Sequence, residues 1–246
     1  MQLTTTNTAM LFAAGLGTRL KPFTNNHPKA LAQVNGKTLL QRNIQYLQQF
    51  DINNVVVNVH HFASQIIDIV DKNNGWGSQI IISDETDEVL ETGGGLKKAI
   101  PLFDDAENVV VMNVDILTNL NINKMFEQHI AANALATLAV TTRETSRYFI
   151  FDLNNKLCGW TNTKTNEIKG TDKFNSAIHK KLAFSGIHII NKKLFALMQQ
   201  QGKFSMVDVY LDLTKTNEII AFDHSNDKFI DVGKPESITD AEVMFG

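Results

Sequence analysis

An α/β fold, with a mostly parallel central sheet and helices on both of its faces, is predicted by three features of this sequence. The chain has 246 residues, 43% of them hydrophobic and 20% charged, which is enough for a large packed core. Up to residue 134, strand-like and helix-like segments alternate in the order βαβαβ. The strand-like segments are nearly continuous apolar runs, which is typical of strands that are buried on both faces.

The elements of the first half follow from the length of each apolar run, its β-branched content and its helical periodicity. The apolar stretch at residues 38–50 keeps its large side chains on one helical face, and Thr38 is placed to be its N-cap. We expect strands at residues 9–14, 55–59, 79–83 and 108–114, and helices at 38–50, 62–71 and from 96 to 100.

After residue 134 the pattern becomes mixed, which predicts a smaller elaboration beside the parallel sheet. The polar segment at residues 161–181 is expected to be an inserted flap. We expect strands near 135–141, 148–153 and 183–190, and helices near 192–201 and 206–213.

Composition excludes several classes of protein. The single cysteine, Cys158, cannot form an intrachain disulfide, and no apolar stretch approaches the roughly 20 residues that cross a bilayer. Residues 1–8 are polar and uncharged, unlike a secretory signal, so we expect a frayed end and a cytoplasmic protein. The net charge of -3 and the pI of about 6.2 argue against a nucleic-acid partner.

Charge is distributed unevenly along the chain. Residues 1–50 contain five basic side chains and no acidic one, whereas the remainder is acidic overall. A basic opening on an otherwise acidic protein indicates a local site for an anion. Phosphate-binding features are therefore expected in this segment.

A glycine-containing loop follows the first predicted strand. Gly15 and Gly17 let the backbone approach a ligand closely, and Arg19 and Lys21 supply positive charge. A glycine turn with solvated basic side chains explains the same residues equally well. The dinucleotide-binding fingerprint does not fit, because it requires a glycine where this chain has Leu20. A Walker loop ending at residue 38 likewise lacks its first glycine, since residue 31 is leucine.

Asp115 follows the most strand-like run of the chain, at residues 108–114. Ligands bind at the carboxyl ends of parallel strands, and Mg2+ prefers carboxylate and phosphate oxygens, so Asp115 is a candidate magnesium ligand. The alternative is that Asp115 caps a helix around residues 121–129. Three consecutive glycines at 93–95 suggest a loop that approaches a base and ribose, or else a flexible hinge.

The stretch FAAGLGTRLKPFT, followed by HPKALAQVNGK, resembles the signature of the sugar nucleotidyltransferase family. The resemblance implies a Rossmann-like fold in which the loop at residues 14–21 wraps a triphosphate. It implies catalytic roles for Arg19, on the β- and γ-phosphates, and for Lys29, on the reacting phosphates. Gln33 and Thr38 stand where the family commonly has prolines, outside the phosphate-contacting positions.

The same resemblance implies the remaining site residues. It assigns a Mg2+ ion to Asp115 and Asp231, although Val114 replaces the glycine that the family usually has before the first aspartate. The implied nucleotide-binding residues are Ala13, Ala14, Gly15, Gly17, Thr18, Arg19, Asn58, Glu91, Thr92 and Gly93, and the implied sugar-binding residues are Asn113, Ser185 and Gly186.

The string ETGGG resembles the members that include N-acetylmuramate 1-phosphate uridylyltransferase, which favours UTP; mannose-1-phosphate guanylyltransferases are also similar. We expect one nucleotidyltransferase domain over residues 1–246, with a nucleotide-binding part at about 9–134 and a sugar-binding part at about 135–246. As a monomer or homodimer, it would transfer UMP from UTP to a sugar 1-phosphate in bacterial cell-wall or surface-polysaccharide biosynthesis. A catalytically silent regulatory protein and a metal-dependent glycosyltransferase, with Asn113 to Asp115 as an imperfect D-x-D motif, are the alternatives.

Overall fold

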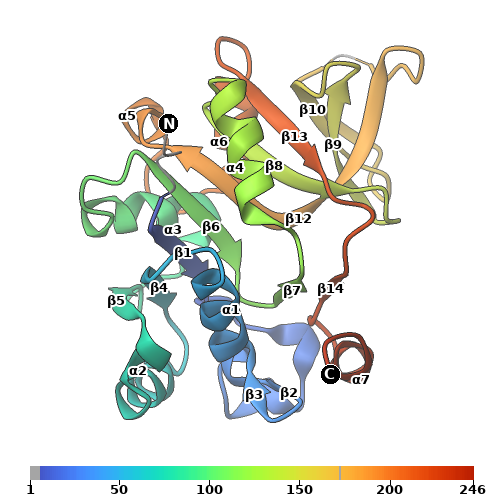
Figure 1. Ribbon diagram of the computed structural model, residues 1–246. Coiled ribbons are helices and arrows are strands. Elements are labelled where there is room, and N and C mark those ends of the chain that lie inside the picture. The colour runs from blue at the N-terminus through green and yellow to red at the C-terminus, as the bar shows by residue number, and fades with distance from the viewer. Residues whose placement is uncertain (1–5, 172) are drawn as a thin grey trace.

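The computed structural model describes residues 6–171 and 173–246, and most of the polar leader at residues 1–8 lies outside them. Four parallel strands form one half of a ten-stranded sheet (Figure 1). Their order is β5 (Gln79–Asp84), β4 (Asn54–Val59), β1 (Thr8–Phe12) and β6 (Asn108–Asn113). The direction in which the chain builds the sheet reverses between β1 and β6, which is where ligands bind in open α/β sheets.

Helices cover both faces of this sheet, as the apolar strands predict. In β1, Leu11 packs into a core with α1 (Leu39–Gln48), α2 (Ala63–Lys72) and α4 (Ile122–Ala131). Met10 faces the opposite core, to which α3, α5 and α6 contribute: α3 is Glu91–Ala99, α5 is Lys193–Leu197 and α6 is Met206–Leu213. The α/β prediction is confirmed, and so is Thr38 as the N-cap of α1, because its side chain accepts a hydrogen bond from the Gln41 amide.

The other half of the sheet is mixed. The long strand β12 (His179–Asn191) pairs antiparallel with β6, and also with β8 (Ala136–Thr141) and β9 (Arg147–Asp152). The remaining strands are β10 (Leu157–Asn162) and β11 (Glu167–Lys169) at the edge, and β13 (Ile219–Asp223) parallel to β8.

Two expectations for this half were wrong. The segment at 161–181 is no separate flap, because it completes β10, forms β11 and begins β12 at the edge of the sheet. The helix expected at 192–201 ends at Leu197, and the residues that follow it pack against α3 instead.

Short elements lie around the carboxyl edge of the parallel strands. The most consequential is a two-stranded pairing of β7 (Ile116–Thr118) with β14 (Phe229–Asp231), which joins the middle of the chain to its end. The others are the β2–β3 hairpin (Gln33–Val34, Lys37–Thr38), α7 (Pro235–Met244) and 3-10 turns at Thr18–Leu20, Phe23–Asn25 and Lys29–Leu31. Two further 3-10 turns, Asn74–Gly77 and Ile100–Leu102, lead into β5 and β6 and therefore lie at the opposite, amino edge.

The three consecutive glycines lie inside α3, so the prediction that they form a loop was wrong. A Cβ on Gly93 would lie 2.4 Å from the Phe204 ring, and one on Gly94 would lie 2.4 Å from the Gly202 carbonyl oxygen. A Cβ on Gly95 would lie 2.7 Å from a Glu85 carboxylate oxygen. The glycines therefore serve close helix packing, because no larger residue fits between α3 and its neighbours.

Within the described residues, no helix combines the length and the apolar character that crossing a bilayer requires.

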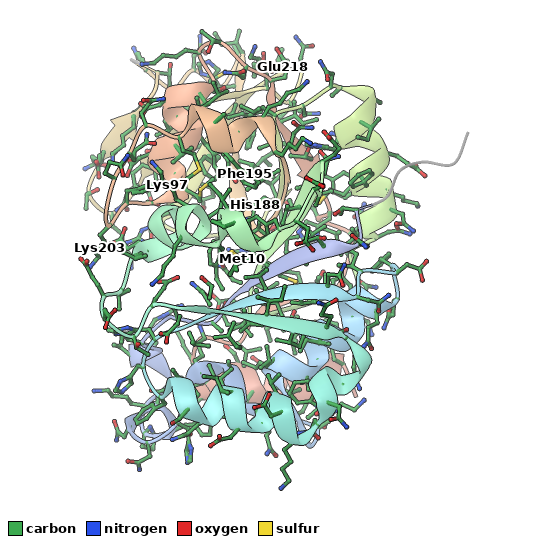
Figure 2. The ribbon with its side chains drawn as sticks, turned by 90° about the vertical axis from the view of Figure 1, so that its left-hand side faces the viewer. Met10, Lys97, His188, Phe195, Lys203 and Glu218 are labelled. Carbon is green, nitrogen blue, oxygen red and sulfur yellow. The ribbon has the colours of Figure 1, made fainter. Side chains whose placement is uncertain are left out.

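A fully buried histidine on β12 makes stability depend on pH. The His188 ring is hydrogen-bonded to the Tyr210 hydroxyl, and Figure 2 shows it near the middle of the molecule. Burial lowers the pKa of His188 to about 3. Since the folded-state pKa lies below the unfolded value of about 6.5, the unfolded chain binds the extra proton between these values, and acidification destabilises the fold.

We expect the free energy of unfolding to fall by up to about 1.4 kcal/mol per pH unit for this one group between pH 6.5 and 4. Replacing His188 with Gln, which is polar but does not titrate, should remove that part of the slope in urea unfolding. The matched control is His61→Gln on the exposed surface. An unchanged slope in His188→Gln would show that His188 does not carry the acid sensitivity.

Candidate active site

A cleft of ≈ 220 Å3 opens at the carboxyl ends of β1, β4 and β6, at the point where the strand order reverses. This is the edge that the sequence predicts for the ligand. The cleft is lined by Phe12, Ala13, Ala14, Gly15, Lys29, Asn58, Glu85, Val89, Glu91, Thr92, Asn113, Val114 and Asp115.

The side chain of Asn58 fixes the start of the loop after β1 through hydrogen bonds. The Asn58 side-chain oxygen accepts hydrogen bonds from the amides of Ala13 (2.6 Å) and Ala14 (3.2 Å). Both residues line the cleft, but their amides already donate to Asn58 and are not free to bind a ligand. Gly15 is open, since a Cβ there would meet no atom within 4 Å, whereas Gly17 has a positive φ of 61° and packs against Lys29.

Glu85 was not predicted from the sequence, and it supports this loop through Asn58. One carboxylate oxygen accepts from the Asn58 amide at 2.7 Å, and the other accepts from the Leu90 amide at 3.3 Å. Glu85 is 1% exposed, and burial raises its pKa against the opposing effect of these hydrogen bonds. Its position directly after β5 is the signal that could have identified it, because the same rule selects Asp115.

The start of α3 contributes the other wall. Glu91 and Thr92 line the cleft as predicted, and the Thr92 hydroxyl oxygen accepts a hydrogen bond from the Met206 amide at 3.0 Å. Gly93 does not line the cleft, because its amide bonds the Phe204 carbonyl oxygen at 2.9 Å on another side of the helix. A contact between Gly93 and a nucleotide stays a prediction.

The two predicted acids come together although 115 and 231 are distant in sequence. Asp231 ends β14 opposite Ile116 of β7, and the Val232 amide donates to the Asp115 carbonyl oxygen at 2.8 Å. The helix-cap alternative for Asp115 is excluded, because the Asn121 side chain caps α4.

Cations from the first fifty residues neutralise both acids. Lys29 forms an ion pair with Asp115, and these side chains are only 12% and 15% exposed. Arg19 lies 3.6 Å from Asp231 at a more exposed position. Burial, and then the nearby charge of Asp115, raise the pKa of Asp231. Arg19, Thr18 and Gly17 are not among the residues that line the cleft, although Gly17 packs against Lys29, which lines it.

The acid pair has the chemistry that a magnesium ion requires. The Asp231 Oδ1 atom is buried and has no hydrogen-bond partner in the described structure, which leaves a carboxylate oxygen free to bind a cation. Among residues 6–171 and 173–246, no cluster of three or more acidic, histidine or cysteine side chains forms a complete metal site. These residues fit a hard cation that takes its other ligands from phosphate and water.

The predicted sugar-side residues separate into one that faces the cleft and two that support it. Asn113 lines the cleft. Gly186 has a φ of 74° and packs behind Asn113, where a Cβ would lie 2.6 Å from its amide nitrogen. Ser185 is 1% exposed and its hydroxyl bonds His224 at 2.7 Å, so its side chain supports the fold, and a sugar contact by this residue stays a prediction.

Comparison with known proteins gives a consistent result. The family model described as nucleotidyl transferase matches residues 8–245. The chain is 43% identical to N-acetylmuramate alpha-1-phosphate uridylyltransferase of Caulobacter vibrioides over 44% of its own length and 45% of that protein's. It is 29% identical to D-glycero-alpha-D-manno-heptose 1-phosphate guanylyltransferase of Aneurinibacillus thermoaerophilus over 95% of this chain and 96% of the relative. The matched region spans only about half the length of the first uridylyltransferase relatives, 45% and 56%.

Solved structures show the same fold. HddC from Yersinia pseudotuberculosis, complexed with GMP-PN, superposes with a TM-score of 0.76 at 26% identity, over 97% of this chain and 99% of that one. A putative glucose-1-phosphate thymidylyltransferase from Bacillus anthracis gives a TM-score of 0.78 at 16% identity, which bears on the fold alone.

The support of the loop by Asn58 can be tested by stability. Asn58→Ala leaves two amides without their acceptor and removes one donor to Glu85, so we expect a loss of about 2–4 kcal/mol in the free energy of unfolding. Urea unfolding of this variant, beside Asn53→Ala on the exposed surface, measures the effect. A loss no greater than that of the control would show that the hydrogen bonds do not hold the loop.

Proposed function

The chain belongs to the nucleotidyl transferase family, and from that premise we propose that it transfers a nucleoside monophosphate, UMP in preference to GMP, from a nucleoside triphosphate to a sugar 1-phosphate. Pyrophosphate is the second product. The observation that carries the proposal is the convergence of Asp115 and Asp231 with Lys29 and Arg19 beside an open glycine at the carboxyl end of β1.

The proposed step is a displacement at phosphorus. A phosphate oxygen of the sugar 1-phosphate forms a bond to the α-phosphorus, and the bond from that phosphorus to the bridging oxygen breaks, so its electron pair leaves with pyrophosphate. The attacking oxygen is already anionic at neutral pH, so no protein base is required. The residues therefore act by positioning and by charge stabilisation.

Lys29 and Arg19 would act on different phosphates of the nucleoside triphosphate. Lys29 lines the cleft and is mostly buried, so its charge acts on the reacting phosphates at low dielectric. Arg19 lies at a more exposed position and suits the β- and γ-phosphates of the leaving group. Asp115 and Asp231 would hold Mg2+, which supplies positive charge to the phosphates when it is bound.

The preference for UMP rests on the ETGGG string and on the N-acetylmuramate uridylyltransferase relatives. The longer matches to guanylyltransferase relatives, and the similarity to HddC complexed with GMP-PN, keep GMP as the competing assignment. A cytoplasmic location in nucleotide-sugar biosynthesis is part of the same proposal.

The first experiment measures pyrophosphate release with Mg2+ for UTP, GTP, CTP, dTTP and ATP against the 1-phosphates of N-acetylmuramate, glucose, mannose, N-acetylglucosamine and heptose. We expect turnover with UTP and one sugar, and loss of turnover when EDTA removes the metal. Turnover with GTP instead would correct the nucleotide. UTP binding with no release across the panel would favour the regulatory alternative, and consumption of a ready-made sugar nucleotide would favour the glycosyltransferase.

Lys29→Met keeps the packing of the side chain against Gly17 and removes its charge. We expect kcat to fall roughly 100- to 1,000-fold, as when one preorganised donor to a developing charge is lost. The thermal midpoint of the apoprotein should fall, because Asp115 loses its ion-pair partner, so kcat is measured well below that midpoint. Lys37→Met, at an exposed position of β3, is the matched control. A kcat within threefold of wild type would remove Lys29 from the catalytic residues.

A further inference from the structure

Arg143, just after the end of β8, is a cation held in a fixed position beside the acid pair. One terminal guanidinium nitrogen donates a hydrogen bond to the Phe184 carbonyl oxygen at 3.0 Å. The guanidinium carbon lies 5.2 Å from the centroid of the Phe229 ring, which gives a cation–π contact. These two contacts fix the orientation of the planar group.

Within residues 6–171 and 173–246, the charge of Arg143 has no close counter-ion. None of the ion pairs within 4 Å in the described part of the chain includes Arg143. Burial lowers its pKa, while the charges of Asp231 and Tyr148 raise it, so Asp231 is near enough to act on it. Arg143 is nevertheless an exposed residue, so its guanidinium is accessible to a ligand.

The two contacts of Arg143 connect it to the cleft from the sugar-binding part. Phe184 lies two residues before Gly186, which packs against Asn113 in the cleft wall. Phe229 lies two residues before Asp231 on the same short strand. Arg143 therefore stands on the opposite half of the sheet from Lys29 and Arg19, which come from the loop after β1.

A purely structural role explains only part of this arrangement. Tying β12 to β14 uses the Phe184 hydrogen bond and the Phe229 contact. A guanidinium has five N-H donors, and one of them is accounted for by a protein hydrogen bond. The remaining donors and the uncompensated charge suit an oxyanion, which a guanidinium binds with two parallel hydrogen bonds.

We propose that Arg143 binds an anionic group of the sugar 1-phosphate and thereby selects that substrate. The inference rests on the proposed transferase function. The group is either the 1-phosphate itself or a carboxylate carried by the sugar, since both present paired oxygens to a guanidinium. The two sources are separated by comparing a sugar with a carboxylate and one without.

The test compares wild type, Arg143→Gln and Arg143→Lys, with Lys124→Gln on the exposed face of α4 as the control for the loss of one charge. Steady-state KM is measured separately for the nucleotide and the sugar 1-phosphate. Calorimetric binding of N-acetylmuramate 1-phosphate and glucose 1-phosphate, with α,β-methylene-UTP present, gives a readout that does not depend on turnover. Thermal midpoints identify any variant that does not fold.

We expect Arg143→Gln to weaken sugar binding roughly 10- to 100-fold, the range for a charge-assisted hydrogen bond, with nucleotide KM changed less than about twofold. Arg143→Lys should restore part of the binding. Weakening for both sugars identifies the 1-phosphate as the partner, and weakening for N-acetylmuramate 1-phosphate alone identifies the carboxylate.

Three results would overturn the inference: equal KM changes for the nucleotide and the sugar 1-phosphate in Arg143→Gln, unchanged binding of both sugars by that variant, or no sugar binding by the wild type. Turnover that survives unchanged in Arg143→Gln leaves the transferase function standing while the inference fails. Sugar binding that depends on Arg143 but is not followed by turnover would support the inference and contradict the transferase function.

Discussion

The antiparallel pairing of β7 with β14 is the constraint on which the site depends. Three residues on each strand place Asp231 beside the backbone of Asp115, although one acid follows β6 and the other lies near the end of the chain. The same strand carries Phe229, on which Arg143 rests. The pairing therefore joins the segment after β6 to the segment after β13 at the acid pair, beside the cleft.

Two neighbouring carboxylates in a partly buried site repel each other and lose hydration, as the raised pKa of Asp231 indicates. The chain compensates with Lys29 and Arg19, which explains why its first fifty residues contain cations and no acid. A metal with bound phosphates could take over that compensation during a reaction. Lys29 would then be free to act on phosphate, so one side chain would both stabilise the apoprotein and serve the chemistry.

The sequence predicted those features that are local, namely the apolar strands, the Thr38 cap and the acids at the carboxyl ends of strands. It did not predict features that depend on tertiary contacts. The glycines of α3 have the composition of a loop, and only the positions of Phe204 and Gly202 explain why a helix needs them. Ser185 has the sequence context of a sugar contact, but His224, thirty-nine residues away, holds its hydroxyl inside the fold. The three-residue strands β7 and β14 are too short for a periodicity to reveal.

The glycines of α3 form a face on which a distant part of the chain packs closely. The segment after α5 lies across it: the Lys97 ammonium donates to the carbonyl oxygens of Met198 and Gln200, and Lys203 lies 3.9 Å from Glu91 (Figure 2 labels both lysines). Glu91 lines the cleft, so a segment from the second half of the chain holds one wall of the cleft. Opening this contact would break the hydrogen bonds that the amides of Gly93 and Gly94 donate to the Phe204 carbonyl oxygen, so the start of α3 and the segment after α5 are tied together at the cleft wall.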